Sequence, residues 1–173
     1  MPSEPVEIMI EDLVSHEIYA RNLIMGQVLF FNLNLPPEWH LAPGVSRPEI
    51  NASSKQTEKG SWVVNGNAWY VLYQNEQHWA LELYASIRPL MGQKSAQRIA
   101  SSGGPVNIAG HNTEVKWNTK RRGLPWNRHD VTFMTLAFDC PHTERRIKLE
   151  FSGWCPQEGF DEILESMRHF KCH

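Results

Sequence analysis

Leucine or phenylalanine occupies every odd position from residue 29 to residue 35, with Phe30, Asn32 and Asn34 between them. A period of two is the pattern of a β-strand that buries one face, so we expect a strand over residues 27–35. Leu29 should lie on its buried face with the other odd positions, and the following two prolines should end it. The same alternation predicts strands over residues 79–87, 106–108, 113–117, 131–139 and 145–151.

Turn residues predict how some of these strands connect. Asn65-Gly66-Asn67 separates the apolar runs 61–64 and 68–73, and Asn-Gly is the pair that tight hairpin turns favour. We therefore expect one hairpin there and another around residues 140–144. The runs together amount to six or seven strands in an antiparallel, meander-like sheet.

Helical periodicity is clearest at the end of the chain. Apolar residues recur at intervals of three and four between residues 158 and 171, which predicts a C-terminal amphipathic helix. Weaker patterns predict short helices over residues 9–20, within an N-terminal segment 1–26, and over residues 89–100. The apolar positions of the C-terminal helix are Phe160, Ile163, Leu164, Met167 and Phe170.

The remaining long segment, residues 36–60, contains four prolines and a polar run from residue 51. This composition is typical of a long surface connection. No internal repeat or boundary divides the chain, so we expect a single domain over residues 1–173. The predicted class is α+β, with the sheet packed against the C-terminal helix, and an α/β sandwich is one form of it.

The order of elements resembles a known fold. An early apolar strand followed by Pro36, Pro37 and Trp39, a strand beginning at Gly110, a closing hairpin and the helix of residues 160–170 resemble the Mog1/PsbP-like α/β sandwich. The likeness covers most of residues 27–171 as an order of elements. Known members of that fold are mainly accessory or binding proteins, so the resemblance implies a non-catalytic module.

Composition narrows the function classes. The chain has 41% hydrophobic and 21% charged residues, which is typical of a globular protein and excludes a disordered or collagenous one. Its formal net charge is -2, so no global field attracts nucleic acid or an anionic membrane. The lack of a long apolar run and of a signal-peptide pattern predicts a soluble, cytoplasmic protein without a membrane partner.

Basic residues nevertheless gather between residues 116 and 129, with tryptophans among them. Cations bind phosphates and exposed rings stack on unpaired bases, so this segment is a candidate site for a polyanion or single-stranded nucleic acid. A solvated or protein-binding loop over residues 118–130 is the alternative. Trp117 is in phase with Val115 and is expected in the core. The candidate ligand-binding residues are Lys120, Arg121, Arg122, Trp126 and Arg128.

Cysteine and histidine residues form a second candidate. The strand of residues 145–152 and the C-terminal helix have similar lengths, so antiparallel packing would return the chain end to the turn after Cys140. Cys140, His142, Cys172 and His173 would then offer the ligands of a structural zinc site. The same geometry permits a Cys140–Cys172 disulfide, and the third alternative is a small buried cysteine at 140. No other cofactor is expected.

A third candidate is catalytic. His111 and Glu114 follow glycine-rich residues and could form a general acid–base pair, although positions 111 and 114 of one strand point to opposite faces. The common catalytic and nucleotide-binding signatures are absent from the sequence. We therefore expect a binding or accessory module that recognises a protein or small ligand, on the sheet face or beside residues 36–60. Polyanion binding and catalysis by His111 are the alternatives.

Overall fold

The computed structural model of the protein describes residues 12–22, 24, 26–43, 52–90, 105–108 and 111–171. Most of these residues form antiparallel β-structure, and helix α1 (Gln157–Met167) follows the last strand. The α+β class is confirmed. The strands are β1 (Val14–Asn22), β2 (Gly26–Leu35), β3 (His40–Pro43), β4 (Ala52–Gln56), β5 (Trp62–Gln74), β6 (Trp79–Pro89), β7 (Pro105–Ile108), β8 (His111–Arg122), β9 (His129–Cys140) and β10 (Arg145–Gly153).

The described strands form one large sheet and one small one. The large sheet has the order β3-β5-β6-β10-β9-β8-β7, and β4 pairs with β5 as well. Strands β7 to β10 follow one another as a meander, and β10 then pairs with β6, with Ile147 opposite Ile87. Strands β1 and β2 form a separate two-stranded sheet. The large sheet thus departs from the meander expected from the sequence, because β6 is followed in it by β10 and β3 pairs with β5 instead of β4.

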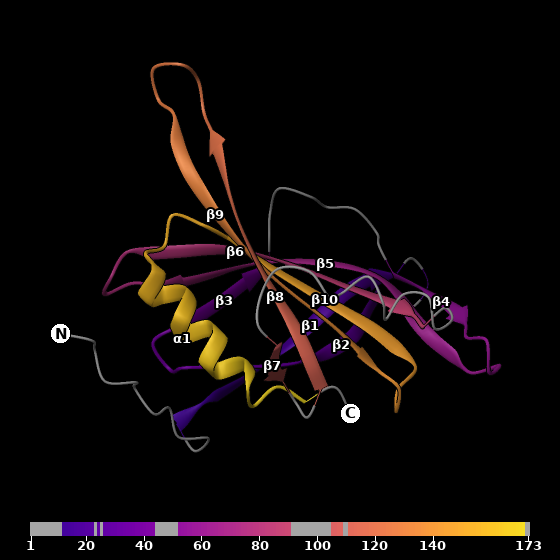
Figure 1. Ribbon diagram of the computed structural model, residues 1–173. Coiled ribbons are helices and arrows are strands. Elements are labelled where there is room, and N and C mark those ends of the chain that lie inside the picture. Colours follow the sequence, from indigo (N-terminus) through magenta and orange to yellow (C-terminus); the bar gives the residue numbers. More distant parts are fainter. Residues whose placement is uncertain are drawn as a thin grey trace.

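The core lies on one face of the large sheet, where α1 and β2 pack. The ring of Phe170, just after α1, contacts Phe31 of β2 at 5.1 Å and Phe138 of β9 at 5.6 Å between centroids. Helix, small sheet and large sheet therefore share one apolar core (Figure 1). The central strands contribute every second side chain to it: Leu81, Leu83, Ala85, Ile87, Met134, Leu136, Phe138, Ile147, Leu149 and Phe151.

Strand β2 contains a bulge at Phe30. Ile18 of β1 lies opposite Phe31, but the next residue, Tyr19, lies opposite Leu29, so Phe30 is the extra residue of β2. The bulge shifts the alternation by one position and turns Phe30 into the core. The prediction that Leu29 is buried is therefore wrong, whereas the rest of the predicted buried face of this strand is confirmed.

Tyr70 of β5 joins the small sheet to the large one beside this bulge. Its hydroxyl accepts a hydrogen bond from the backbone N–H of Tyr19 at 2.9 Å and donates one to the carbonyl oxygen of Tyr19 at 3.2 Å. One side chain thus satisfies both backbone groups of a residue at an irregular point of β1. Burial raises the pKa of Tyr70, which keeps the donated proton in place.

The predicted turn at residues 65–67 is wrong, because β5 runs through it without interruption. Gly66 lies opposite Ala52 of β4 on one side and Ile87 of β6 on the other. Arg88 of β6 also donates a hydrogen bond to the carbonyl oxygen of Gly66 at 2.7 Å. Pairing with two neighbouring strands outweighs the local preference of Asn-Gly for a turn.

Two predictions nearer the N-terminus are also wrong. Residues 14–22 form β1 instead of the end of a helix over residues 9–20, because they pair with the apolar strand β2 and bury Ile18 and Ala20. Residues 9–11 lie outside the described residues. The predicted surface connection 36–60 contains β3 and β4, and Trp39 within it is only 1% exposed.

The other predicted strands and the hairpin around residues 140–144 are confirmed. Helix α1 is shorter than predicted, because it ends at Met167 and not at residue 171. The N–H groups of residues 168, 169 and 170 instead bond to carbonyl oxygens three residues back, as in a tighter final turn. Residues 91–100, on which most of the predicted helix 89–100 falls, lie outside the described part of the chain.

Candidate functional site

The end of the β8–β9 hairpin extends beyond the strands that flank it. On one side, β7 pairs only with residues 111–114 of β8. On the other side, β10 ends at Gly153, which lies opposite Thr132 of β9. Residues 120–131, which we call the arm, therefore form a ribbon of two strands and their connecting turn (Figure 1, orange). Both edges of this ribbon lie outside the ladder of the large sheet.

The arm corrects the prediction of a loop over residues 118–130. Strand β8 continues to Arg122 and β9 begins at His129, with Arg122 opposite His129. The turn is confined to residues 123–128. The sequence pattern does not reveal these strand ends. Both faces of an exposed ribbon meet water, so its residues need not alternate between apolar and polar.

Hydrogen bonding and glycine geometry shape the turn. The N–H of Asn127 donates to the carbonyl oxygen of Leu124 at 2.8 Å, which closes a turn with Pro125 in its second position. Gly123 has a φ of +104°, and a Cβ there would lie 2.1 Å from the carbonyl oxygen of Asn127. The turn therefore requires glycine at position 123. It holds residues 124–127, which we call the apex, at the far end of the arm.

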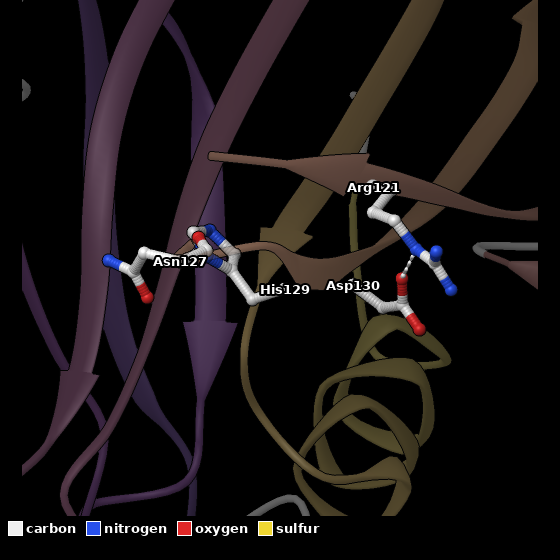
Figure 2. A network of polar contacts seen from close by, with 4 residues as sticks. All are labelled: Arg121, Asn127, His129 and Asp130. Carbon is white, nitrogen blue, oxygen red and sulfur yellow. Dashed lines mark hydrogen bonds and ion pairs between the residues drawn. The ribbon is translucent and has the colours of Figure 1, made fainter. Parts of the chain in front are cut away.

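The arm concentrates positive charge. It contains four Lys and Arg residues and Asp130 as its acidic residue, a formal net charge of +3, so the remaining residues of the chain carry -5 of the total of -2. Figure 2 shows the guanidinium of Arg121 turned toward Asp130, with Nε and Oδ1 3.4 Å apart. Both groups are exposed, so this ion pair contributes little to stability. Among the described residues, Lys120, Arg122 and Arg128 have no such acidic partner.

Some aromatic side chains on and beside the arm already contact other residues of the fold. The ring of Trp154 meets that of His129 edge-on at 4.2 Å, and Nζ of Lys120 lies 5.0 Å above the ring of Phe133. Trp117, expected in the core, packs against Phe160 of α1 but keeps 42% of its surface exposed.

At the apex, Trp126 is 81% exposed and Leu124 is 58% exposed. These are large apolar side chains presented to solvent by a protruding turn. Sequence reasoning singled out Trp126 but missed Leu124, Phe133 and Trp154 as members of this surface. The alternation of β9 would have placed Phe133 on the face opposite to the core, but the position of Trp154 depends on where β10 ends.

The predicted acid–base pair is not formed. His111 and Glu114 both lie in β8, and the ring of His111 stacks on Phe138 of the core at 5.6 Å. Glu114 is three positions along the strand and therefore points to the other face, where Nζ of Lys116 lies 3.5 Å from its carboxylate. The two side chains cannot share a proton across the sheet.

The cysteine and histidine candidates are only partly described. Cys140 is buried at the end of β9, and His142 is exposed in the turn that follows. The ring of Phe170 contacts that of Phe138, two residues before Cys140. Cys172 and His173 lie outside the described residues, so the zinc and disulfide alternatives stay predictions. Within the described ranges, no three His, Cys, Asp or Glu side chains are grouped to hold a metal ion.

Cys155, between β10 and α1, is buried and chemically protected. Burial raises the pKa of its thiol to about 12 from 9.0, and the charge of Glu162 acts in the same direction, while a hydrogen bond from the backbone of Gly159 opposes them. The folded state therefore holds this proton more tightly than the unfolded state does. Its contribution to stability is present below pH 9.0 and is lost as the pH rises toward about 12.

We expect Cys155 to resist iodoacetamide in the folded protein at pH 8, because about one thiol in ten thousand is then the reactive thiolate. Peptide mapping by mass spectrometry after timed alkylation measures the rate at this residue. The same chain unfolded in urea is the control, and there Cys155 should react at the ordinary rate of a free thiol. Equal rates in the folded and unfolded chains would contradict the prediction.

Comparison with protein-family models, with curated proteins and with solved structures finds no match to the chain. The resemblance to the Mog1/PsbP-like sandwich stays a prediction. In the described part of the chain, no helix has the length and apolar character needed to cross a bilayer.

Proposed function

We propose that the protein is a non-catalytic binding module and that the arm is its contact surface for a phosphate-rich, polyanionic partner. The observation that carries the proposal is the placement of +3 of formal charge on a ribbon that leaves the sheet, within a chain of net charge -2. The proposal keeps the expected class, a binding module. It replaces the expected protein or small ligand on the sheet face with a charged partner at the arm.

Geometry favours the arm over the other candidates. Lys120, Arg122 and Arg128 are exposed and lie outside the ion pairs of the described residues, so their charge is available to a partner. The ribbon also extends beyond the strands that flank it, so both of its edges are open to an extended polyanion (Figure 1). His111 and Glu114, by contrast, lie on opposite faces of β8, which leaves the catalytic alternative without a geometric basis.

A double variant, Arg122→Gln with Arg128→Gln, tests the proposal. A single-stranded oligothymidylate of about 20 residues serves as a simple polyphosphate, and its binding is measured by fluorescence anisotropy at several salt concentrations. Loss of two phosphate contacts should lower the magnitude of the slope of log K against log salt by about 1.4, since each contact with single-stranded nucleic acid contributes about 0.7. Arg121 is left in place because Asp130 already offsets its charge.

The matched control is Lys55→Gln with Lys59→Gln. These two exposed lysines, in β4 and in the turn after it, give the same change in net charge at a distance from the arm along the sheet. The control should keep the slope of the original protein. If both double variants change the slope equally, or if neither does, the arm is not the contact surface and the proposed function fails.

A further inference from the structure

We infer that the arm docks on an anionic lipid surface, with Leu124 and Trp126 inserted among the headgroups. The inference rests on the proposed function of the arm as a polyanion-binding surface, and it names the partner. It differs from the expectation that the protein has no membrane partner. That expectation was based on the net charge of the whole chain and on the lack of a membrane-spanning segment. A peripheral contact needs neither, because a short apolar apex and a few cations are sufficient for reversible binding.

The order of side chains along the arm matches the layers of a bilayer surface. Leu124 and Trp126 lie farthest out and are exposed, and Arg122 and Arg128 flank them on the two strands. Lys120 lies two residues further back, about 7 Å along the strand. Interfacial segments bury their apolar side chains about 5–10 Å into the headgroup region, where tryptophan is favoured, while lysine and arginine meet the anionic headgroups. The cations of the arm would then lie at the depth of the lipid phosphates.

The backbone of the turn at the apex favours insertion of the apex among lipid headgroups. Pro125 has no N–H, and the N–H of Asn127 is already bonded to the carbonyl oxygen of Leu124. Two of the four apex positions therefore have no free backbone N–H that would have to leave water. The left-handed conformation of Gly123 fixes the direction of the turn before any contact occurs, so little ordering of the apex is required on binding.

Single-stranded nucleic acid fits the same charge less well. Base stacking along a strand needs successive free ring faces. On this surface Phe133 lies under Lys120, and Trp154 meets the ring of His129. Trp126 is the ring at the apex, and its neighbour Leu124 offers no stacking face. At the apex, one exposed ring lies beside one exposed leucine, which is the pattern of an inserting turn. Trp117 and Trp154 are also exposed, by 42% and 64%, but each already has a ring contact within the fold, with Phe160 and His129 respectively.

Vesicle sedimentation tests the inference. Vesicles of phosphatidylcholine are compared with vesicles in which about a third of the lipid is phosphatidylserine, and the bound fraction gives a partition coefficient. The anionic vesicles should bind the protein more strongly. Trp126→Ser and Leu124→Ser should each lower the coefficient about tenfold, because partial burial of one large apolar side chain is lost. Arg122→Gln with Arg128→Gln should lower it about 25-fold, at about fivefold for each cation.

Trp62→Ser is the matched control, because Trp62 is 69% exposed at the start of β5 and lies outside the arm. It should leave the partition coefficient unchanged. Unchanged thermal midpoints would show that each variant is folded, as expected for exposed positions.

Three results would overturn the inference. The first is oligothymidylate binding that responds to the arm cations as proposed, without binding to anionic vesicles; the lipid partner then fails while the polyanion surface stands. The second is vesicle binding that needs Arg122 and Arg128 but not Leu124 or Trp126, which would mean adsorption without insertion. The third is a larger loss of oligothymidylate affinity than of vesicle affinity in Trp126→Ser, which would assign this ring to base stacking.

Discussion

Trp39→Ala is expected to lower the free energy of unfolding by about 3–5 kcal/mol, the range for loss of a large aromatic side chain from a packed core. Trp39 is almost completely buried although it follows two prolines in a segment outside the long strands. Its ring packs against Trp79 of β6 at 6.2 Å between centroids. Its Nε1 donates a hydrogen bond to the carboxylate of Glu162 in α1 at 2.9 Å. The substitution would therefore remove a contact between the sheet and the helix.

Urea unfolding followed by far-ultraviolet circular dichroism measures this effect. Trp62→Ala is the control, because its largely exposed ring should change stability by no more than about 0.5 kcal/mol. Trp39→Phe separates packing from hydrogen bonding, since it keeps an aromatic ring but leaves Glu162 without its donor; a loss of about 1–3 kcal/mol is expected. Equal stability of the Trp39→Ala and Trp62→Ala proteins would show that the described packing of Trp39 is incorrect.

Gly159→Ala is expected to cost about 2 kcal/mol of stability, although alanine is the better helix former by about 1 kcal/mol. Gly159 lies in the first turn of α1, where a Cβ would come within 1.8 Å of Sγ of Cys155 and 3.1 Å of the ring of Trp79. Steric overlap should exceed the gain in helix propensity, because both neighbours are held in place by the core.

A double-mutant cycle isolates the cause of that cost. In a Cys155→Ala background the closest neighbour of the new methyl group is absent, so Gly159→Ala should then be close to neutral. Chemical unfolding of the four proteins gives the coupling energy between the two positions. If Gly159→Ala costs the same with and without the sulfur atom, the clash with Cys155 is not its cause.

Sequence alternation predicted those strands that have one face in the core and one in water. The β9–β10 hairpin and the strand at residues 79–87 are of this kind, and both are confirmed. The prediction at Asn65-Gly66 was wrong because a turn preference acts locally, whereas β5 gains partners on both of its sides from segments distant in sequence. No local pattern reports which strands will be neighbours.

Two other differences have the same origin in tertiary structure. The position of Leu29 depends on a single extra residue in β2, and that bulge is set by the register with β1. The side chain of Trp39 packs against Trp79 and bonds to Glu162, which lies 123 residues further along the chain. From its sequence, a proline-rich segment is predicted to lie at the surface, because its packing partner is distant in the chain.

The candidate site shows the same division. The cluster of cations and Trp126 could be found from residue types alone. That they form a ribbon could not, because it depends on where β7 and β10 stop pairing. That His111 and Glu114 lie on opposite faces was predictable from strand geometry, because residues three apart on a strand point in opposite directions.

The separation of charge between the arm and the rest of the chain gives the molecule an electric dipole. A uniformly charged protein of net charge -2 would be repelled by a negative surface at any orientation. Here a +3 arm is joined to a remainder of -5, so an approaching surface exerts a torque that turns the arm forward and the acidic remainder back. The field extends over about one Debye length, roughly 8 Å at physiological salt. Encounters with a polyanion should therefore be oriented before any side chain touches it.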